Sequence, residues 1–588
     1  MFGKIINFDN SRIMIENLKG IADTNYIGFH VVFPDQDHKI VGEIVSIDTN
    51  KITIMLVGEI NNQNKFTSGV LKKPSINSTA RLIYKEELET VLGNQNFQDK
   101  NTILFGTSPI YKNFYITSDL NEFFSNHFAI LGNTGSGKSC GLARLIQNIF
   151  YSSGSNIPKN AHICLFDAYG EYYNTFDAMN NIEGLHSKKY TTQIGFENND
   201  LISIPAYLLD VDDLAILLGA TSPNQIYILR RTINLARIFN SNDPKAIDFK
   251  NDIIANCILD ILSSGKKSNQ MRDQIISVLT AYNTETLNLN SPITQPGYNR
   301  TLKQCLNIDD QGKMNAMNIV VDFFQQFKKI DIDRIELDST TQYSLNDLYY
   351  ALEFALINEG ALLSDKIYEE NNVLKSHLHS IINSELVNMF DSSKVTTKAD
   401  YVENFFKVTG TNEYCQLVDI NLSYLDDKFA KAITKIFSKL FFEYTTNLEK
   451  RGSFPIHLVL EEAHRYVQND SDVEIIGYNI FDRITKEGRK YGTILGFITQ
   501  RPNELSKTAL SQCSNFIVFK LFYPEDLNIV ANMSSNVTAE TIEQIKTLHP
   551  GMSLVFGSAF KIPLLVNFPL PNPLPISTSL KLDNIWYE

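Results

Sequence analysis

The most constraining feature of this chain is a glycine-rich loop between an apolar stretch at 127–131 and an amphipathic stretch after 140. The loop has the G-x-x-x-x-G-K-[ST] spacing of a phosphate-binding loop. Glycines let successive backbone N–H groups converge on an anion at a helix N-terminus, where the helix dipole favours negative charge. The residues expected to bind the phosphates are Gly132, Asn133, Thr134, Gly135, Ser136, Gly137, Lys138, Ser139 and Cys140.

Two side chains of this loop have specific expected roles. We expect Lys138 to reach the β- and γ-phosphates of ATP, and Ser139 to ligate Mg²⁺. The competing interpretation is a glycine-rich turn that contains a Lys-Ser pair by accident. The strand before the loop and the helix after it favour the nucleotide site.

Composition sets broad limits. The chain has 588 residues, 43% of them hydrophobic, and should form two or three folded domains. It contains no run of eighteen apolar residues and no secretory signal at its N-terminus, so we expect a cytoplasmic protein with no membrane segment. The six cysteines form no C-x-x-C pair, which argues against a disulfide framework or a zinc site.

The net charge of −13 argues against a protein that coats nucleic acid by bulk electrostatics. It leaves DNA binding open, because a ring around a duplex needs positive charge only on the loops that line its channel. The basic pairs at 188–189, 230–231 and 266–267 are better explained as solvated helix faces than as DNA contacts.

A second apolar strand, at 456–460, ends in the acid pair Glu461 and Glu462. Two acids at the tip of a buried strand form the second half of a phosphate-loop ATPase site. Glu461 is expected to hold Mg²⁺ through water, and Glu462 to polarise the attacking water. The strand at 493–498 leads to Gln500, which can sense the γ-phosphate, and Arg489 precedes that strand. Arg489 is either an arginine finger for a neighbouring subunit or a surface charge at a helix end.

The strand at 162–166 also runs into a polar loop, which contains Asp167 and Glu171. Ligands bind at the carboxyl edge of open α/β sheets, so either acid is a candidate to face the nucleotide. An ordinary turn with a solvated acid explains each residue equally well.

The order of these motifs resembles the HerA family of hexameric ATPases, within the HerA and FtsK group of DNA-pumping motors. The resemblance implies the roles given above for Lys138, Ser139, Glu461, Glu462 and Gln500, and makes Arg489 the trans-acting arginine. In relatives the first acid is often Asp, so Glu461 adds a methylene to the metal ligand. The matching blocks lie at 127–139, 167–172, 461–467, 487–492, 500–502, 511–513 and 550–557.

The expected fold class is α/β, a RecA-like P-loop ATPase core with a small N-terminal β-barrel and a helical insertion. The barrel, similar to the HAS-barrel of relatives, is expected over residues 1–100. The core is expected in two parts, 101–204 and 411–570. Between them, 205–410 reads as a helical insertion, and 571–588 as a C-terminal tail.

Two functional hypotheses follow from the resemblance. The first is a homo-hexameric motor that hydrolyses ATP and moves along double-stranded DNA, supplying it to a nuclease. The second is an assembly platform in anti-phage defence, in which the N-terminal barrel docks a nuclease or a sirtuin-like NADase and ATP controls the activity of that effector. Both hypotheses require the same site for ATP and Mg²⁺.

Overall fold

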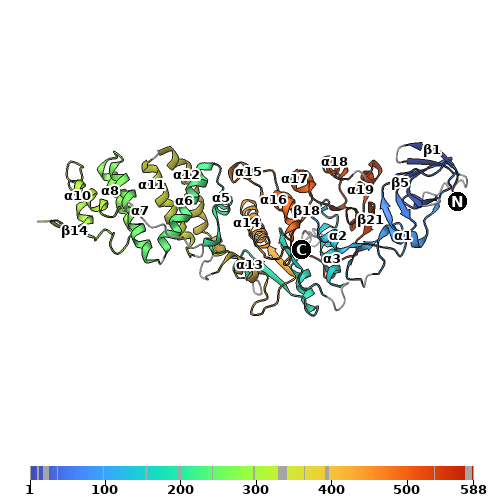
Figure 1. Ribbon diagram of the computed structural model, residues 1–588, viewed down its shortest axis with the longest axis horizontal. Helices are drawn as coiled ribbons and strands as arrows, with labels where there is room; N and C mark the ends of the chain where they lie inside the picture. Colours follow the sequence, from blue (N-terminus) through green and yellow to red (C-terminus); the bar gives the residue numbers. More distant parts are fainter. Residues whose placement is uncertain are drawn as a thin grey trace.

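The computed structural model shows an elongated molecule with three parts (Figure 1). A β-rich N-terminal part lies at one end, a large mixed sheet lies in the centre, and a group of helices extends to the other end. The structure describes residues 2–9, 12–17, 26–35, 38–96, 99–151, 157–195, 200–241, 243–295, 298–328, 341–362, 365–390, 396–534, 537–576 and 586. Most of the predicted tail, at 577–585 and 587–588, lies outside these residues.

The N-terminal part is one antiparallel sheet with strand order β1-β2-β5-β4-β3-β7, and β6 pairs with β5. Alternate residues point inward, so Ile13, Ile15, Ile52 and Ile54 are fully buried. The strands are β1 (Ile5–Asp9), β2 (Arg12–Glu16), β3 (His30–Pro34), β4 (His38–Ile47), β5 (Lys51–Asn61), β6 (Phe66–Ser68) and β7 (Arg81–Leu82).

The closed barrel predicted for this region is not confirmed. The edge strands β1 and β7 form no ladder with each other among the described residues, and a single bridge between Lys4 and Thr79 joins the two edges. The reason is the length of β7, which has only two residues and cannot supply a full closing ladder.

The central sheet has twelve strands in the order β13-β12-β16-β11-β17-β18-β10-β19-β20-β21-β8-β9. The eight strands from β13 to β19 are parallel, and β20, β21, β8 and β9 extend the sheet antiparallel. The strands are β8 (Thr102–Thr107), β9 (Tyr115–Asp119), β10 (Phe128–Leu131), β11 (His162–Asp167), β12 (Ser187–Thr191), β13 (Asp200–Leu201), β16 (Leu417–Asn421), β17 (Ile456–Leu460), β18 (Thr493–Thr499), β19 (Asn515–Phe519), β20 (Met552–Gly557) and β21 (Leu564–Asn567).

Helices cover both faces of the sheet, because its parallel strands are apolar on both sides. In β10, Ala129 and Leu131 join one core cluster, and Phe128 and Ile130 join the other. The helices of this part are α1 (Lys85–Leu92), α2 (Leu120–Phe124), α3 (Lys138–Tyr151), α4 (Tyr173–Asp177), α14 (Asp427–Thr446), α15 (Asp472–Ile475), α16 (Ile480–Glu487), α17 (Lys507–Ser511), α18 (Pro524–Met533) and α19 (Ala539–Thr547).

The third part lies between β13 and β16 in the chain and is mainly helical (Figure 1). Its long helices pack on one another, with α6 and α7 against α11 and with α11 against α12. Its elements are α5 (Val211–Leu218), α6 (Pro223–Asn240), α7 (Pro244–Ser263), α8 (Ser268–Ala281), β14 (Pro292–Gln295), β15 (Tyr298–Thr301), α9 (Leu302–Cys305), α10 (Met317–Gln325), α11 (Leu345–Leu362), α12 (Asp365–Ile382) and α13 (Lys398–Phe406).

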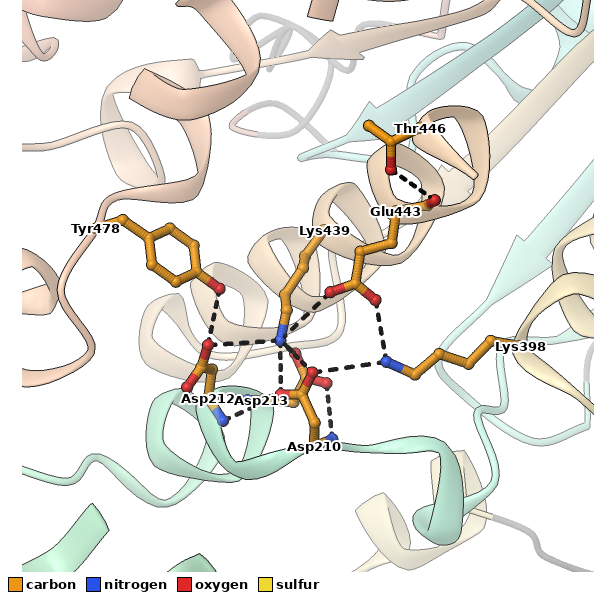
Figure 2. Close-up of polar contacts among 8 residues, drawn as sticks. All are labelled: Asp210, Asp212, Asp213, Lys398, Lys439, Glu443, Thr446 and Tyr478. Atoms are coloured by element: carbon orange, nitrogen blue, oxygen red, sulfur yellow. Dashed lines mark hydrogen bonds and ion pairs between the residues drawn. The ribbon is translucent and has the colours of Figure 1, made fainter. Parts of the chain in front are cut away.

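A polar network around the buried Lys439 joins this helical part to the central sheet (Figure 2). The Lys439 ammonium, on α14, donates to both carboxylate oxygens of Asp210 at 2.6 Å and to Asp213 at 3.1 Å. Lys398 donates to Glu443 at 3.0 Å. Burial raises the pKa of Asp213 to about 7. Burial alone would raise the pKa of Asp210, but the charges of Lys439 and Lys398 outweigh burial and lower this pKa to about 2.

Candidate active site

The phosphate-binding loop is present as predicted between β10 and α3. Gly135 and Gly137 have φ angles of 73° and 105°, in the left-handed region that favours glycine. A Cβ on Gly137 would lie 2.9 Å from the backbone nitrogen of Gly551, so no larger residue fits there. The Lys138 ammonium donates to the carbonyl of Asn133 at 3.1 Å, which holds it across the loop.

Neighbouring strands hold the loop in shape. The Asn133 N–H donates to the carbonyl of Lys520 at 2.9 Å, and the Gly551 N–H donates to the carbonyl of Ser136 at 3.0 Å. Both partners follow or precede strands of the central sheet. The loop is therefore pre-organised, and a phosphate would not have to order it.

The acid pair lies at the tip of β17, beside the loop. Glu461 is 4% exposed, and its Oε2 accepts the Ala168 N–H at 3.1 Å. The extra methylene of Glu461 thus reaches the loop after β11. Burial, together with the nearby Asp167 carboxylate, raises the pKa of Glu461 well above its usual range. Burial also raises the pKa of Glu462, against the opposing charge of Lys138.

Glu462 has an unusual backbone. Its φ and ψ are 47° and 46°, a left-handed conformation that is costly for a residue other than glycine, asparagine or aspartate. His464 Nδ1 lies 3.3 Å from Glu462 Oε2 and 3.0 Å from the Thr499 hydroxyl. Strained residues of this kind cluster at functional sites, where the surrounding structure fixes them.

Strand β18 lies between β10 and β17 in the sheet. Its tip therefore places Gln500 between the phosphate loop and the acid pair. Gln500 Oε1 accepts the Thr134 hydroxyl at 2.6 Å, and the Gln500 backbone contributes a hydrogen bond that lowers the pKa of Glu462. Gln500 thus contacts both halves of the site.

These groups surround a cleft of about 380 Å³. Of the residues predicted to bind the phosphates, Gly132, Asn133 and Ser136 do not line this cleft. Ser136 instead donates its hydroxyl to the Asn133 carbonyl at 2.6 Å and shapes the loop from within. The lining residues are Thr134, Gly135, Gly137, Lys138, Ser139, Cys140, Tyr169, Glu171, Glu461, Glu462, Ile498 and Gln500.

Arg489 is not brought to this cleft within one chain. It lies in a short 3-10 helix, Gly488–Lys490, that precedes β18, whereas Gln500 follows that strand. Seven residues of strand span about 23 Å, so Arg489 is at the opposite edge of the sheet. It is exposed there, and its charge reaches His127, whose pKa is lowered to about 4 chiefly by burial.

The structure separates the roles of the two acids after β11, which the sequence left open. Asp167 is fully buried and does not face the cleft. Its carboxylate accepts the backbone N–H groups of Tyr169, Gly170 and Tyr172 at 3.1, 2.7 and 3.0 Å. Glu171 lines the cleft. Burial raises the pKa of Glu171, while the Ser139 hydroxyl and the Lys138 charge lower it.

Sequence reasoning missed Asp419, a third buried acid of this region. It lies in β16 beside β11 and is 2% exposed, and burial next to Asp167 raises its pKa well above the usual range. An acid inside an otherwise apolar strand, Leu417–Asn421, was the available signal.

The residues present fit a nucleotide with a magnesium ion. The cleft is lined by Lys138, by the Ser139 hydroxyl and by the carboxylates of Glu171, Glu461 and Glu462. Among the described residues, no three His, Cys, Asp or Glu side chains are grouped so that they could hold a metal ion by themselves. Magnesium bound through a hydroxyl, phosphates and water needs no such cage.

The strand order and this cleft define a P-loop ATPase. The family described as "Helicase HerA, central domain" matches residues 106–320. The DNA double-strand break repair helicase HerA of Pyrococcus furiosus is 24% identical over 491 residues, covering 82% of this chain and 70% of that protein. The protein of the same name from Sulfolobus acidocaldarius is 24% identical over 572 residues, covering 96% and 87%. The chain is thus similar to HerA proteins over most of its length, and it is an ATP-hydrolysing enzyme.

Solved structures with a similar arrangement are more distant. VirB4 of Thermoanaerobacter pseudethanolicus aligns with a TM-score of 0.43 and 12% identity, over 79% of this chain and 96% of that one. Within the described part of the chain, no helix combines the length and the apolar character needed to cross a membrane.

Proposed function

We propose that this protein is a homo-hexameric ring motor that hydrolyses ATP, with Mg²⁺, and moves on double-stranded DNA. One observation carries the proposal: each chain has a cleft with a phosphate loop, an acid pair and a sensor, while Arg489 lies at the opposite edge of the same sheet. A ring brings that edge of one subunit to the cleft of the next. The curated relatives are named as DNA repair helicases, which supports DNA as the track.

Each residue of the cleft has a role in the proposed hydrolysis. The loop N–H groups and Lys138 bind the phosphates, and Ser139 and Glu461 hold the metal. Magnesium, when bound, supplies positive charge to the phosphates and to the buried Glu461 carboxylate. Glu462 orients the attacking water and takes its proton, while Gln500 reports the γ-phosphate to the rest of the sheet. Arg489 of a neighbour offsets the charge that develops at the transferred group.

The DNA contacts are expected on loops that meet only in the ring. Lys188 and Lys189 are unsuitable, because they lie 3.4 Å from Asp200 and 3.5 Å from Asp177 in ion pairs. These two lysines stabilise the edge of the central sheet. Binding through channel loops should weaken steeply as salt rises.

The test measures ATP hydrolysis by the full chain with and without linear duplex DNA. We expect DNA to stimulate the wild-type protein, and Lys138→Ala to lose hydrolysis by at least about a hundredfold while it still assembles. The matched control is Lys546→Ala, on α19 and outside the cleft, which should behave as wild type. Unchanged hydrolysis in Lys138→Ala refutes the enzyme mechanism, and a lack of both DNA stimulation and salt-sensitive DNA binding refutes translocation.

A second candidate is an ATP-controlled platform for a nuclease or a sirtuin-like NADase in anti-phage defence. The observation that favours it is the N-terminal part, which lies at one end of the molecule (Figure 1). Its segment between β6 and β7 exposes Leu71 and Ile76 at 97% and 59%. Such side chains suit a protein partner. ATP hydrolysis that responds to the co-expressed effector and not to DNA would select this candidate, and Leu71→Asp should then abolish the response.

A further inference from the structure

The C-terminal segment after β21 crosses the phosphate-loop helix. Residues 568–576, here called the strap, lie against α3 and are fixed there by Gln147, which is 0% exposed. Gln147 Nε2 donates to the Asn572 carbonyl at 3.0 Å, and Gln147 Oε1 accepts the Asn572 N–H at 3.1 Å. A buried amide is costly unless both of its ends are bonded, and the strap satisfies both.

The strap then reaches the loop after β11. The Thr175 hydroxyl donates to the Pro573 carbonyl at 3.5 Å, and the Ile576 N–H donates to the carbonyl of Glu171 at 2.8 Å. Pro571 and Pro575 of the strap are buried. The strap is therefore a direct link between α3 and the residue whose carboxylate lines the cleft.

The loop that carries Glu171 needs contacts from other segments to keep its shape. It turns sharply at Gly170, which has a φ of 73°, and it is held from below by the Asp167 carboxylate. Asp167 does not bond Glu171 itself, since its three partners are Tyr169, Gly170 and Tyr172. The Ile576 N–H supplies the backbone contact at Glu171.

We propose that the strap positions the Glu171 carboxylate in the nucleotide cleft, which Ser139 also lines, so that magnesium-dependent nucleotide binding requires the strap. This inference rests on the proposed ATP site. Gln147 is then a positioning residue, since it lies nine positions after Lys138, about 13 Å along the helix, and cannot touch the nucleotide. Glu171 is the group through which the strap acts.

The experiment measures the dissociation constant of a fluorescent ATP analogue for the full chain, once with Mg²⁺ and once with EDTA. The ratio of the two constants reports the contribution of the metal. Ile576→Pro removes the N–H that bonds Glu171 and also fixes φ at that position. Its matched control Ile576→Ala keeps that N–H, and the side chain is 46% exposed, so both should fold. A deletion of 577–588 is a second control that leaves the strap intact.

We expect Ile576→Pro to reduce the magnesium ratio about fivefold, the effect of one lost hydrogen bond. Gln147→Met and Glu171→Gln should reduce it at least as much, and both controls should keep the wild-type ratio. A wild-type ratio in Ile576→Pro and Gln147→Met overturns the inference, even where the melting temperature falls, because the strap would then be only structural. If wild-type protein fails to bind the analogue at all, the proposed function fails instead.

Discussion

At the scale of single residues, the most informative position is Glu462. The chain holds this residue in a left-handed conformation directly after β17, where the strand ends and the carboxylate enters the cleft. A left-handed conformation costs a residue with a Cβ roughly 1–2 kcal/mol, which the packing around the strand tip must offset. This backbone conformation sets the direction in which the Glu462 side chain leaves the strand tip.

Two variants at this position separate function from strain. We expect Glu462→Ala and Glu462→Gly to lose ATP hydrolysis by about 10²–10⁴-fold, because both lack the group that takes the proton. Glycine adopts the left-handed conformation freely, so Glu462→Gly should be more stable than Glu462→Ala by about 1 kcal/mol. Thermal unfolding of the two inactive proteins side by side gives the comparison, and equal stability would mean that the backbone is not strained.

Glu43 gives a second residue-scale prediction, on pH. It lies opposite His30 on the paired strands β3 and β4 and faces a cavity between the N-terminal sheet and β21. Burial raises the pKa of Glu43 to about 7, above its usual 4.5. The unfolded chain releases this proton more easily, so the contribution of Glu43 to stability falls as pH rises from about 4.5 to 7 and then levels off.

Replacing Glu43 removes this loss. Glu43→Gln should raise the melting temperature at pH 8 relative to wild type and leave it almost unchanged at pH 4.5, the sign required by a raised carboxyl pKa. The control is Glu86→Gln, an exposed acid in the first turn of α1, which should have no such pH-dependent effect. A Glu43→Gln protein with the wild-type pH profile would contradict the assignment.

At the scale of elements, the sequence predicted the strands and helices around the site well. The apolar runs that end in Gly132, Glu461 and Gln500 are strands, since buried parallel strands must be apolar throughout. Their order in space was not predictable, because the pairing of β18 between β10 and β17 is a non-local contact that leaves no local pattern. Residue types likewise could not decide that Glu171 faces the cleft while Asp167 is buried.

Helix α14 connects the active site to the helical part of the molecule. Its first residue, Asp427, is ion-paired with Arg465, three positions after Glu462. Its last turns carry Lys439 and Glu443 in the polar network of Figure 2. Twenty helical residues span about 30 Å. This one rigid element therefore reaches from the acid pair to the contact between the central sheet and the helical part, here called the joint.

The network is predicted to hold the joint through Lys439. Lys439→Met leaves the buried Asp213 carboxylate and the partly exposed Asp210 carboxylate without their main cation, which should cost the joint about 3 kcal/mol. Hydrogen exchange should then rise in α5 and α14 and stay unchanged in β10. Adding Asp213→Asn should recover part of the loss, since it removes one of the stranded charges. Lys450→Met, at an exposed position after α14, is the control; protection equal to wild type in Lys439→Met would contradict the role of the network.

At the scale of the whole molecule, the sheet itself separates the two halves of the proposed reaction. Residues at the carboxyl ends of β10, β17 and β18 form the cleft, and Arg489 lies about 23 Å away where β18 begins. A rigid twelve-stranded sheet cannot fold Arg489 back to its own cleft. If Arg489 acts in this reaction, it must therefore act from another copy of the chain.

This geometry predicts complementation between two inactive chains. Arg489→Ala should lower hydrolysis about 10³-fold or more while leaving ATP bound, because the loop and acids are intact. The Arg489→Ala chain is co-expressed with the Lys138→Ala chain in equal amounts. At about a quarter of the interfaces of the mixed rings, the intact cleft of an Arg489→Ala subunit then faces the intact Arg489 of a Lys138→Ala subunit. Activity should return in the mixture to roughly that fraction of wild type. Rings of confirmed mixed composition that stay inactive would show that Arg489 does not act across subunits, and the exposed arginine would then be only a surface charge.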